Sequence, residues 1–191
     1  LTRLFPRVFS IAKRVRTDTA IGENPVSVAY AAVDLAGHIF SDLTRCNALL
    51  VGAGETIELV ARHLVGAGVR QIVIANRTPA RADALADRIG EPGRVSTVYW
   101  EDLHDAGAFE MVVNGTAAGH QREALVLPFS LIGRRAVVYD MNYGRAAIDF
   151  LAWGRAAGSE HVYDGAGMLV EQAAEAFERW HGVRPETDPV Y

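Results

Sequence analysis

A glycine-rich turn joins an apolar run to a helical pattern in the first half of the chain, at residues 51–56. Gly52 permits a tight turn, and Gly54 lets the backbone approach a phosphate group because it has no Cβ. The amides of Glu55 and Thr56 then begin the helix, where backbone N–H groups favour negative charge. The turn is typical of a site that holds the pyrophosphate of a dinucleotide.

The turn departs from the usual fingerprint at its third glycine, because Ile57 occupies that position. A Gly-x-Gly pair by itself is a weak motif. It is equally compatible with an ordinary connection between a strand and a helix, so the interpretation depends on the next segment.

That second segment, Asn76-Arg77-Thr78, ends the next apolar run. An NAD-binding domain has an acidic residue near this position, which holds the ribose 2′-hydroxyl. Arg77 instead offers a planar guanidinium that suits a 2′-phosphate, and Thr78 adds a hydroxyl. The alternative is a solvated arginine and a helix cap at Thr78, although a cap does not exclude a phosphate contact. Together the two segments predict a dinucleotide site that prefers NADP(H).

Short apolar runs alternate with helical patterns from residue 47 onward. We expect strands at 48–51, 71–75, 95–99, 111–114, 136–140 and 159–163. We expect helices at 57–65, 79–89, 148–157 and 168–180. Strands that alternate with helices predict an α/β fold with a Rossmann-type doubly wound parallel sheet, whose ligand lies at the carboxyl ends of the strands.

Two further helices are predicted before this domain, at 3–16 and from 25 to about 40. We interpret residues 1–44 as linker helices and residues 45–191 as an NADP(H)-binding Rossmann-like domain. Apolar side chains recur on one face of the first helix, at Leu4, Phe5, Val8, Ile11 and Val15. Such a stripe tends to be buried against a partner, so we expect a homodimer through this helix.

The composition excludes several function classes. The chain has 191 residues, half of them apolar, and a net charge of −4, which gives no reason to expect nucleic acid or an anionic membrane as a partner. No apolar run approaches the roughly 18 residues of a membrane span, and no signal-peptide pattern is present. The single cysteine is typical of a reducing compartment, so we expect a cytoplasmic protein. The first residue is Leu1, from which we expect an excised or processed fragment.

The first part of the chain resembles glutamyl-tRNA reductase, a family that Ile57 also fits. The residues that carry this resemblance are 9–17, 25–29, 52–61 and 74–78. It extends over about residues 1–78 and implies a linker helix and an NADP-binding domain.

The second part resembles the NADP-binding half of shikimate dehydrogenase, over about residues 95–191. The residues that carry this resemblance are 113–119, 139–143, 150–153 and 164–182. Residues 79–94 fit either family, and both families have related NADP-binding domains. We therefore interpret the chain as a composite of two families, engineered or recombined.

The combined resemblance implies a set of cofactor contacts. They are Gly52, Ala53, Gly54, Glu55, Thr56, Asn76, Arg77, Thr78, Asn114, Thr116, Met141 and Gly165. Met141 and Gly165 are expected near the nicotinamide, whereas Tyr143 and Gln172 are expected to contact the substrate. Asp140 ends a strand in the same region and is expected to orient the loop that follows.

No catalytic residue is identified. The resemblance to glutamyl-tRNA reductase implies a cysteine nucleophile, and the resemblance to shikimate dehydrogenase implies a Lys–Asp pair. In each family these catalytic residues belong to an amino-terminal domain, which we expect to be absent here. Lys13, the only lysine, is expected on a solvated helix face, and Cys46 is expected to be a buried, unreactive thiol. The six histidines have no metal-ligand spacing, so no metal site is predicted.

The main functional hypothesis is an NADP(H)-binding domain without a complete catalytic site. The first alternative is an active NADP-dependent oxidoreductase that is similar to shikimate dehydrogenase or glutamyl-tRNA reductase. The second is an engineered chimeric scaffold without activity.

Overall fold

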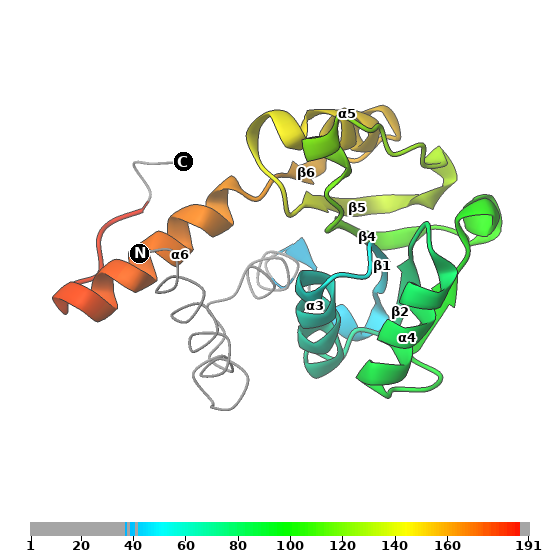
Figure 1. Cartoon of the computed structure of the whole chain (residues 1–191), viewed down its shortest axis with the longest axis horizontal. Helices are drawn as coiled ribbons and strands as arrows, with labels where there is room; N and C mark the ends of the chain where they lie inside the picture. Colours follow the sequence, from blue (N-terminus) through cyan, green and yellow to red (C-terminus); the bar gives the residue numbers. More distant parts are fainter. Residues whose placement is uncertain (1–36, 38, 41, 188–191) are drawn as a thin grey trace, which may run out of the picture.

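The computed structural model describes residues 37, 39–40 and 42–187 of the chain. A parallel sheet with strand order β3-β2-β1-β4-β5-β6 forms its centre (Figure 1). The strands are β1 (Asn47–Val51), β2 (Gln71–Ala75), β3 (Val95–Val98), β4 (Phe109–Asn114), β5 (Ile132–Asp140) and β6 (His161–Tyr163). The α-helices with described bounds are α3 (Glu55–Gly66), α4 (Pro79–Ile89), α5 (Ile148–Ala156) and α6 (Ala166–His181). The predicted α/β fold with a doubly wound parallel sheet is therefore confirmed.

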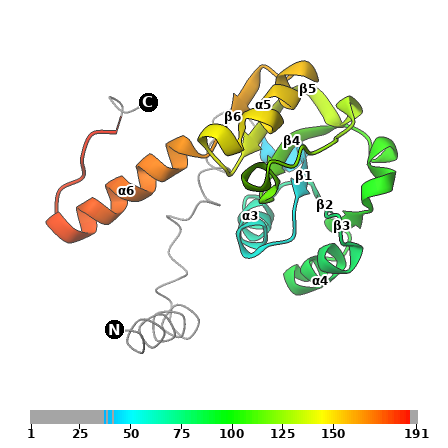
Figure 2. The same ribbon diagram turned by 45° about the horizontal axis from the view of Figure 1, so that its top comes forward.

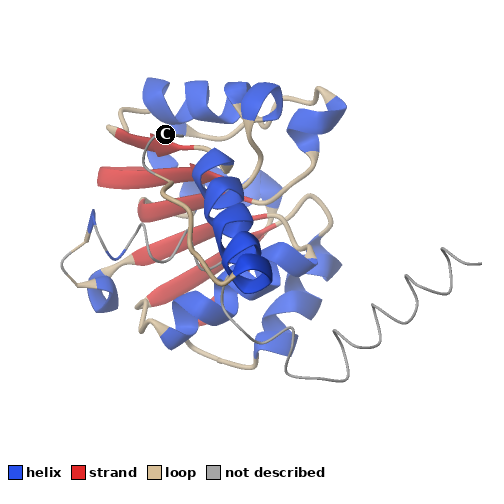
Figure 3. Cartoon of the chain, turned by 90° about the vertical axis from the view of Figure 1, so that its left-hand side faces the viewer, coloured by secondary structure: helices blue, strands red, loops and turns tan. Residues whose placement is uncertain are grey.

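The strands are apolar on both faces because helices cover both faces of the sheet, as Figure 3 shows. Along β1, Leu50 packs with Ile57 of α3 and Ala82 of α4. The next residue back, Leu49, belongs to the opposite layer and packs with Phe150 of α5. Alternate side chains of a strand point to opposite faces, so the short run of four apolar residues serves two cores at once.

Local signals account for the bounds of α4. Thr78 precedes it, Pro79 occupies its first position, and Gly90 ends it in the left-handed conformation with φ 75°. A proline is tolerated at the first position because the N–H of that residue has no partner in the helix. Both α4 and β2 have the bounds predicted from the sequence.

Of the strands that the structure describes, only β2 has the predicted bounds. β1 and β3 differ by one residue, and β4 begins at Phe109 rather than 111. The starts of the last two strands differ as well. β5 begins at Ile132 rather than 136, and its register against β4 shifts between Phe109 and Met111. The added residues include Arg134 and Arg135, and Arg135 has φ 63°, so no apolar alternation marks them. β6 begins at His161 rather than 159, since the Ser159 N–H donates to the Gly154 carbonyl of α5 at 3.0 Å instead of to the sheet. The Ser159 hydroxyl donates to the Ala136 carbonyl at 2.7 Å.

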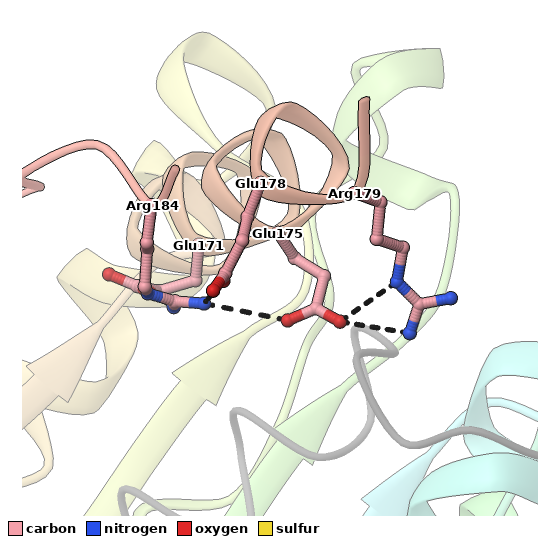
Figure 4. Close-up of polar contacts among 5 residues, drawn as sticks. All are labelled: Glu171, Glu175, Glu178, Arg179 and Arg184. Atoms are coloured by element: carbon pink, nitrogen blue, oxygen red, sulfur yellow. Dashed lines mark hydrogen bonds and ion pairs between the residues drawn. The ribbon is translucent and has the colours of Figure 1, made fainter. Parts of the chain in front are cut away.

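Helix α6 extends away from the sheet beyond β6 (Figures 1 and 2). The segment after the helix folds back onto it through Arg184, whose guanidinium pairs with Glu171, Glu175 and Glu178 at 2.7, 3.5 and 3.2 Å (Figure 4). Glu175 also pairs with Arg179 one turn later, at 2.9 Å. These contacts hold the end of the described chain against the helix that contains Gln172.

The two predicted linker helices and the stripe from Leu4 to Val15 lie outside the described residues. The boundary at residues 44 and 45 therefore stays a prediction, although a short 3-10 helix occupies Leu43–Arg45. Within the described residues, no helix has the length and apolar character needed to cross a membrane.

Candidate functional site

The candidate site lies where the strand order reverses, between β1 and β4, at the carboxyl ends of the strands. Two backbone bonds extend the sheet into the loops there: Gly52 N–H donates to the Ala75 carbonyl at 2.8 Å, and Gly115 N–H donates to the Val51 carbonyl at 2.9 Å. The loops after β1 and β4 are thereby held to the ends of neighbouring strands. In open α/β sheets this position is where ligands bind.

The glycines of the turn have the conformations that the sequence predicts. Gly52 has φ 119°, in a region that side chains disfavour, and an added Cβ would lie 3.3 Å from the carbonyl carbon of Gly115. Gly54 has an ordinary φ of −89°, and an added Cβ there would meet no atom within 4 Å. Because the space in front of the Gly54 backbone is open, packing within the protein does not require a glycine at this position.

Helix α3 begins directly after this turn. Its first internal bond runs from the Glu58 N–H to the Gly54 carbonyl, at 3.0 Å, so the preceding amides of the first turn lie outside the hydrogen-bond ladder of the helix. Glu58 itself is occupied elsewhere, since it pairs with Arg62 and with Arg88 of α4. Burial opposes the charge of Glu58, but the two guanidinium groups outweigh it and lower its pKa.

Ile57, which replaces the third glycine, is fully buried beneath the loop after β4. A Cβ added at Gly115 would lie 2.5 Å from the Cγ1 atom of Ile57. The close approach that the usual fingerprint obtains from a glycine on the helix is obtained here from Gly115 on the opposite loop. Sequence reasoning on the turn alone did not identify Gly115.

A cleft of about 240 Å³ opens above the turn. Six of the predicted cofactor residues line it: Gly52, Ala53, Gly54, Asn76, Arg77 and Thr116. The other lining residues were not predicted as cofactor contacts from the sequence; they are Arg81, Trp100, Gly115, Ala117, Ala118, Gln121 and Leu125. The structure therefore brings the two predicted segments together in one cavity.

Two arginines lie on the β2 side of this cleft. Arg77 follows β2, and Arg81 lies in the first turn of α4, where its guanidinium makes no hydrogen bond or ion pair with another residue that the structure describes. Trp100 follows β3 and adds an aromatic surface to the same wall. The sequence signal that could have identified Arg81 is its place two residues after Pro79, in the first turn of a helix that follows β2.

Thr78 occupies the predicted cap position of α4, but its side chain makes no capping hydrogen bond. Its carbonyl instead accepts from the Asn76 side-chain amide at 3.0 Å and from the Arg81 N–H at 3.0 Å. The predicted side-chain cap is therefore wrong, and the exposed hydroxyl of Thr78 does not line the cleft.

A buried polar network supports the opposite wall. Asp140 accepts from the Asn114 side-chain amide at 3.1 Å and from the Asn142 N–H and side-chain amide at 2.9 and 2.8 Å. Asn114 in turn accepts from the N–H and hydroxyl of Thr116, at 3.0 and 2.8 Å. Asn114 and Asp140 are almost fully buried, so they position the loops rather than face the cleft. The expectation that Asp140 orients the following loop is confirmed.

Burial is the main influence on the ionisation of Asp140. It raises the pKa of this carboxyl above its usual value, although hydrogen bonds from the Asn142 backbone and from the Asn114 and Asn142 amides act in the opposite direction. The nearby Asp164 carboxylate adds to the rise. A buried carboxyl that accepts several N–H groups is a stiff structural element of the site.

The remaining predicted residues lie around the cleft without lining it. Met141 is buried in the core beside the loop after β4. Gly165 lies against it so closely that an added Cβ would be 2.5 Å from the Met141 carbonyl oxygen. Tyr143 is half exposed at the next loop, and Gln172 is half-buried on α6. Glu55 and Thr56 form the first turn of α3.

Cys46 is buried at the entry of β1, at the opposite end of the strand from the cleft. Burial raises the pKa of its thiol, and the carboxylates of Glu110 and Asp42 raise it further. The prediction that Cys46 is an unreactive thiol agrees with this environment. The described part of the chain holds no cluster of three or more side chains that could bind a metal ion.

Comparison with known families identifies two matching models. Residues 34–123 match the model described as shikimate / quinate 5-dehydrogenase, and residues 165–191 match the shikimate 5′-dehydrogenase C-terminal domain. The first match includes the glycine turn and the Asn-Arg-Thr segment. It also crosses residues 79–94, where the composite interpretation places a junction between two families.

Individual relatives agree with these models. A shikimate dehydrogenase (NADP(+)) of Stenotrophomonas maltophilia is 53% identical over 159 residues, which are 83% of this chain and 57% of that protein. The crystal structure of an Ael1 enzyme from Pseudomonas putida is similar at 35% identity and a TM-score of 0.72, over 86% of this chain and 60% of that one.

A shikimate 5-dehydrogenase of Thermus thermophilus, in complex with NADP(H) and shikimate, has 29% identity and a TM-score of 0.63 over 86% of this chain and 59% of that one. The chain thus spans a little over half the length of the relatives it matches.

One family accounts for the glycine turn, the Asn-Arg-Thr segment and the carboxyl-terminal helix, which the composite interpretation divided between two. Over residues 34–123 and 165–191 the chain is similar to the shikimate dehydrogenase family.

Proposed function

We propose that the described domain binds NADP(H) in the cleft between β1 and β4. The observation that carries this proposal is the meeting of the glycine turn with two arginines in a single cavity. The turn offers backbone N–H groups and an open space at Gly54, which suit a pyrophosphate. Arg77 and Arg81 lie on the side where the β2 end would meet the adenosine ribose, and a guanidinium binds a 2′-phosphate well.

The names of the relatives support this choice of cofactor, since the Stenotrophomonas protein is a shikimate dehydrogenase (NADP(+)) and the Thermus structure contains NADP(H). The remaining predicted contacts follow from the direction of the cofactor. With the adenosine end at Arg77, the nicotinamide end extends across the loops after β4 and β5, toward Thr116, Met141 and Gly165. NADP(H) supplies a hydride acceptor or donor when bound, and the chain supplies its orientation.

We further propose that the substrate is a hydroxylated ring acid of the shikimate kind. Tyr143 and Gln172 would contact it from the nucleotide-binding side. Tyr143 lies on the loop after β5 and Gln172 on α6, and both keep part of their surface exposed. A Tyr143→Phe variant should then raise the Kd for shikimate, measured by calorimetry with NADPH bound, and leave the affinity for NADPH unchanged.

Proton transfer needs a further group. The only lysine of the sequence, Lys13, lies outside the described residues, so the domain contains no Lys–Asp pair of the kind expected for this family. We propose that the chain binds the cofactor without efficient turnover. The alternative is an active oxidoreductase, and the third hypothesis is a scaffold without a ligand.

Two measurements separate these three hypotheses. Titration of NADPH fluorescence with the purified chain should show saturable binding that is tighter than that of NADH, and no binding would leave only the scaffold. Incubation with shikimate and NADP⁺ should then give no increase in absorbance at the NADPH band. Robust turnover would show that the chain is an active enzyme.

The amino-terminal stripe carries a separate proposal of a homodimer. Burial of a leucine- or phenylalanine-sized side chain contributes roughly 1.5–3 kcal/mol, so five such groups favour a partner surface over water. Deletion of residues 1–18 should give a monomer with unchanged NADPH affinity. A monomer both before and after the deletion, measured by light scattering, would contradict the proposal.

Two other expectations also remain proposals. A cytoplasmic location agrees with the single buried thiol, and cell fractionation would test it. A glutamyl-tRNA reductase origin of the first 78 residues is opposed by the family match from 34 to 123. Separate alignment of residues 1–33 with both families would test whether a composite boundary lies before that match.

A further inference from the structure

An ion pair crosses the mouth of the cofactor cleft. The Nη1 atom of Arg77 donates to the Oε2 atom of Glu123 at 2.8 Å. The two residues come from different walls: Arg77 follows β2, whereas Glu123 follows the short 3-10 helix Ala118–Gln121 on the loop after β4. Both side chains keep about half of their surface exposed, at 59% and 48%. The guanidinium proposed for the 2′-phosphate thus already holds an anionic partner.

The backbone fixes the place of Glu123. Arg122 adopts the left-handed conformation with φ 56°, and the Glu123 N–H donates to the Ala118 carbonyl at 3.0 Å. Its neighbours Gln121 and Leu125 both line the cleft. The main chain therefore aims Glu123 at the cleft mouth, while its exposed side chain can rotate away when another anion arrives.

A carboxylate and a phosphate present the same chemistry to an arginine, because both offer negatively charged oxygens to a planar set of N–H donors. A phosphate monoester is the stronger anion, with a charge of about −1.5 to −2 near neutral pH. The Glu123 carboxylate is bound to the Nη1 atom of Arg77, so a 2′-phosphate that binds the same guanidinium would compete with this carboxylate and be repelled by its charge. NAD(H) has a hydroxyl at that position and can leave the ion pair intact.

We propose that Glu123 is an internal anion that competes with the 2′-phosphate for Arg77 and so sets how strongly the domain prefers NADP(H) over NAD(H). This inference rests on the proposed function of the cleft. It assigns to Glu123 a role in specificity that is opposite in sign to that of Arg77, since Glu123 weakens NADP(H) binding and leaves NAD(H) binding unchanged.

The test compares wild type with Glu123→Gln, which keeps the shape of the side chain and removes its charge. NADPH and adenosine 2′,5′-bisphosphate should bind about two- to fivefold more tightly to the variant, because an exposed ion pair of this kind is weak. NADH and 5′-AMP, which lack the 2′-phosphate, should bind with unchanged affinity. Circular dichroism checks that the fold is retained.

Two further variants make the comparison specific. Glu160→Gln removes the same charge next to the amino end of β6, far from the cofactor end of the sheet, and should change none of the four affinities. In an Arg77→Ala background, Glu123→Gln should give much less improvement, because no guanidinium remains to be released.

The results decide between the possibilities. Unchanged or weaker binding of NADPH to Glu123→Gln overturns the competition, as does an equal gain for NADH or an undiminished gain in the Arg77→Ala background. Wild type that binds NADPH while Glu123→Gln shows no gain contradicts only this inference. Wild type that binds neither NADPH nor adenosine 2′,5′-bisphosphate contradicts the proposed function as well.

Discussion

Replacement of Arg77 by alanine tests whether this side chain distinguishes NADPH from NADH by binding the 2′-phosphate. The variant removes the guanidinium that would meet the 2′-phosphate and leaves the glycine turn at Gly52 and Gly54 intact. NADPH affinity should fall, and NADH affinity should change less than about twofold, because NADH places only a hydroxyl near this position. The difference between the two cofactors is the quantity of interest, since any general damage to the domain would weaken both.

The expected size of the loss follows from the surroundings of Arg77. Hydrogen bonds to charged groups contribute about 1.5–3 kcal/mol. The side chain is 59% exposed, so screening by water favours the lower part of this range. Displacement of Glu123 offsets up to about 1 kcal/mol more, as is typical of exposed ion pairs. The net loss should be about 1–2 kcal/mol, or roughly five- to thirtyfold in Kd.

The assay is titration of NADPH and NADH fluorescence at fixed ionic strength, with Arg134→Ala as the matched control. Arg134 is exposed near the amino end of β5, whereas the cleft lies at the carboxyl ends of the strands. Its removal therefore changes the net charge of the chain equally without changing the cleft. Equal losses for NADPH and NADH would refute the assignment of Arg77 to the 2′-phosphate. A similar loss in the control would show that only the overall charge matters.

Three further variants probe other parts of the site. Gly54→Val should abolish binding of both cofactors and leave the circular dichroism spectrum unchanged, because a Cβ there meets no protein atom within 4 Å and the valine side chain would fill the space for the pyrophosphate; normal affinity would show that the turn is only a connector. Gly119→Ala should lower stability by about 1–3 kcal/mol in denaturant unfolding, because its Cβ would overlap the Ala146 carbonyl, and wild-type stability would contradict that packing. Asp140 has a raised pKa in the folded state. Its contribution to the free energy of unfolding is therefore greatest below the unfolded pKa near 3.8 and is lost as the pH rises through the folded pKa. Asp140→Asn should remove this part of the pH dependence and also lower stability, since an amide N–H₂ would face the Asn114 amide. If the free energy of unfolding changes equally with pH for both proteins between pH 3 and 7, the raised pKa of Asp140 is refuted.

The elements of this fold could be predicted from the sequence because their signals are local. β2 is a short run of apolar residues, and α4 has a proline at its first position and a glycine after its last, so their bounds depend on neighbours a few residues away. β5 could not be delimited in this way. Its first residues include a left-handed Arg135, and their place in the sheet depends on pairing with β4, more than 20 residues earlier.

The candidate site divides along the same line. Gly52, Gly54 and Arg77 could be assigned from the sequence, because their chemistry follows from residue type and from distance to the end of a strand. The sequence did not indicate that Ile57 and Gly115 fit together, or that the Asn114 amide donates to the Asp140 carboxylate. Those relations join residues that are 26 to 58 positions apart and exist only after the sheet has formed.

The pairing of Arg77 with Glu123 shows this limit most clearly. The two residues are 46 positions apart and are separated by two strands, one α-helix and two 3-10 helices. The sequence determined that an arginine follows β2 and that the cleft can take a phosphate. Only the tertiary structure, by placing the loop after β4 opposite the end of β2, decided that the carboxylate of Glu123 pairs with that arginine.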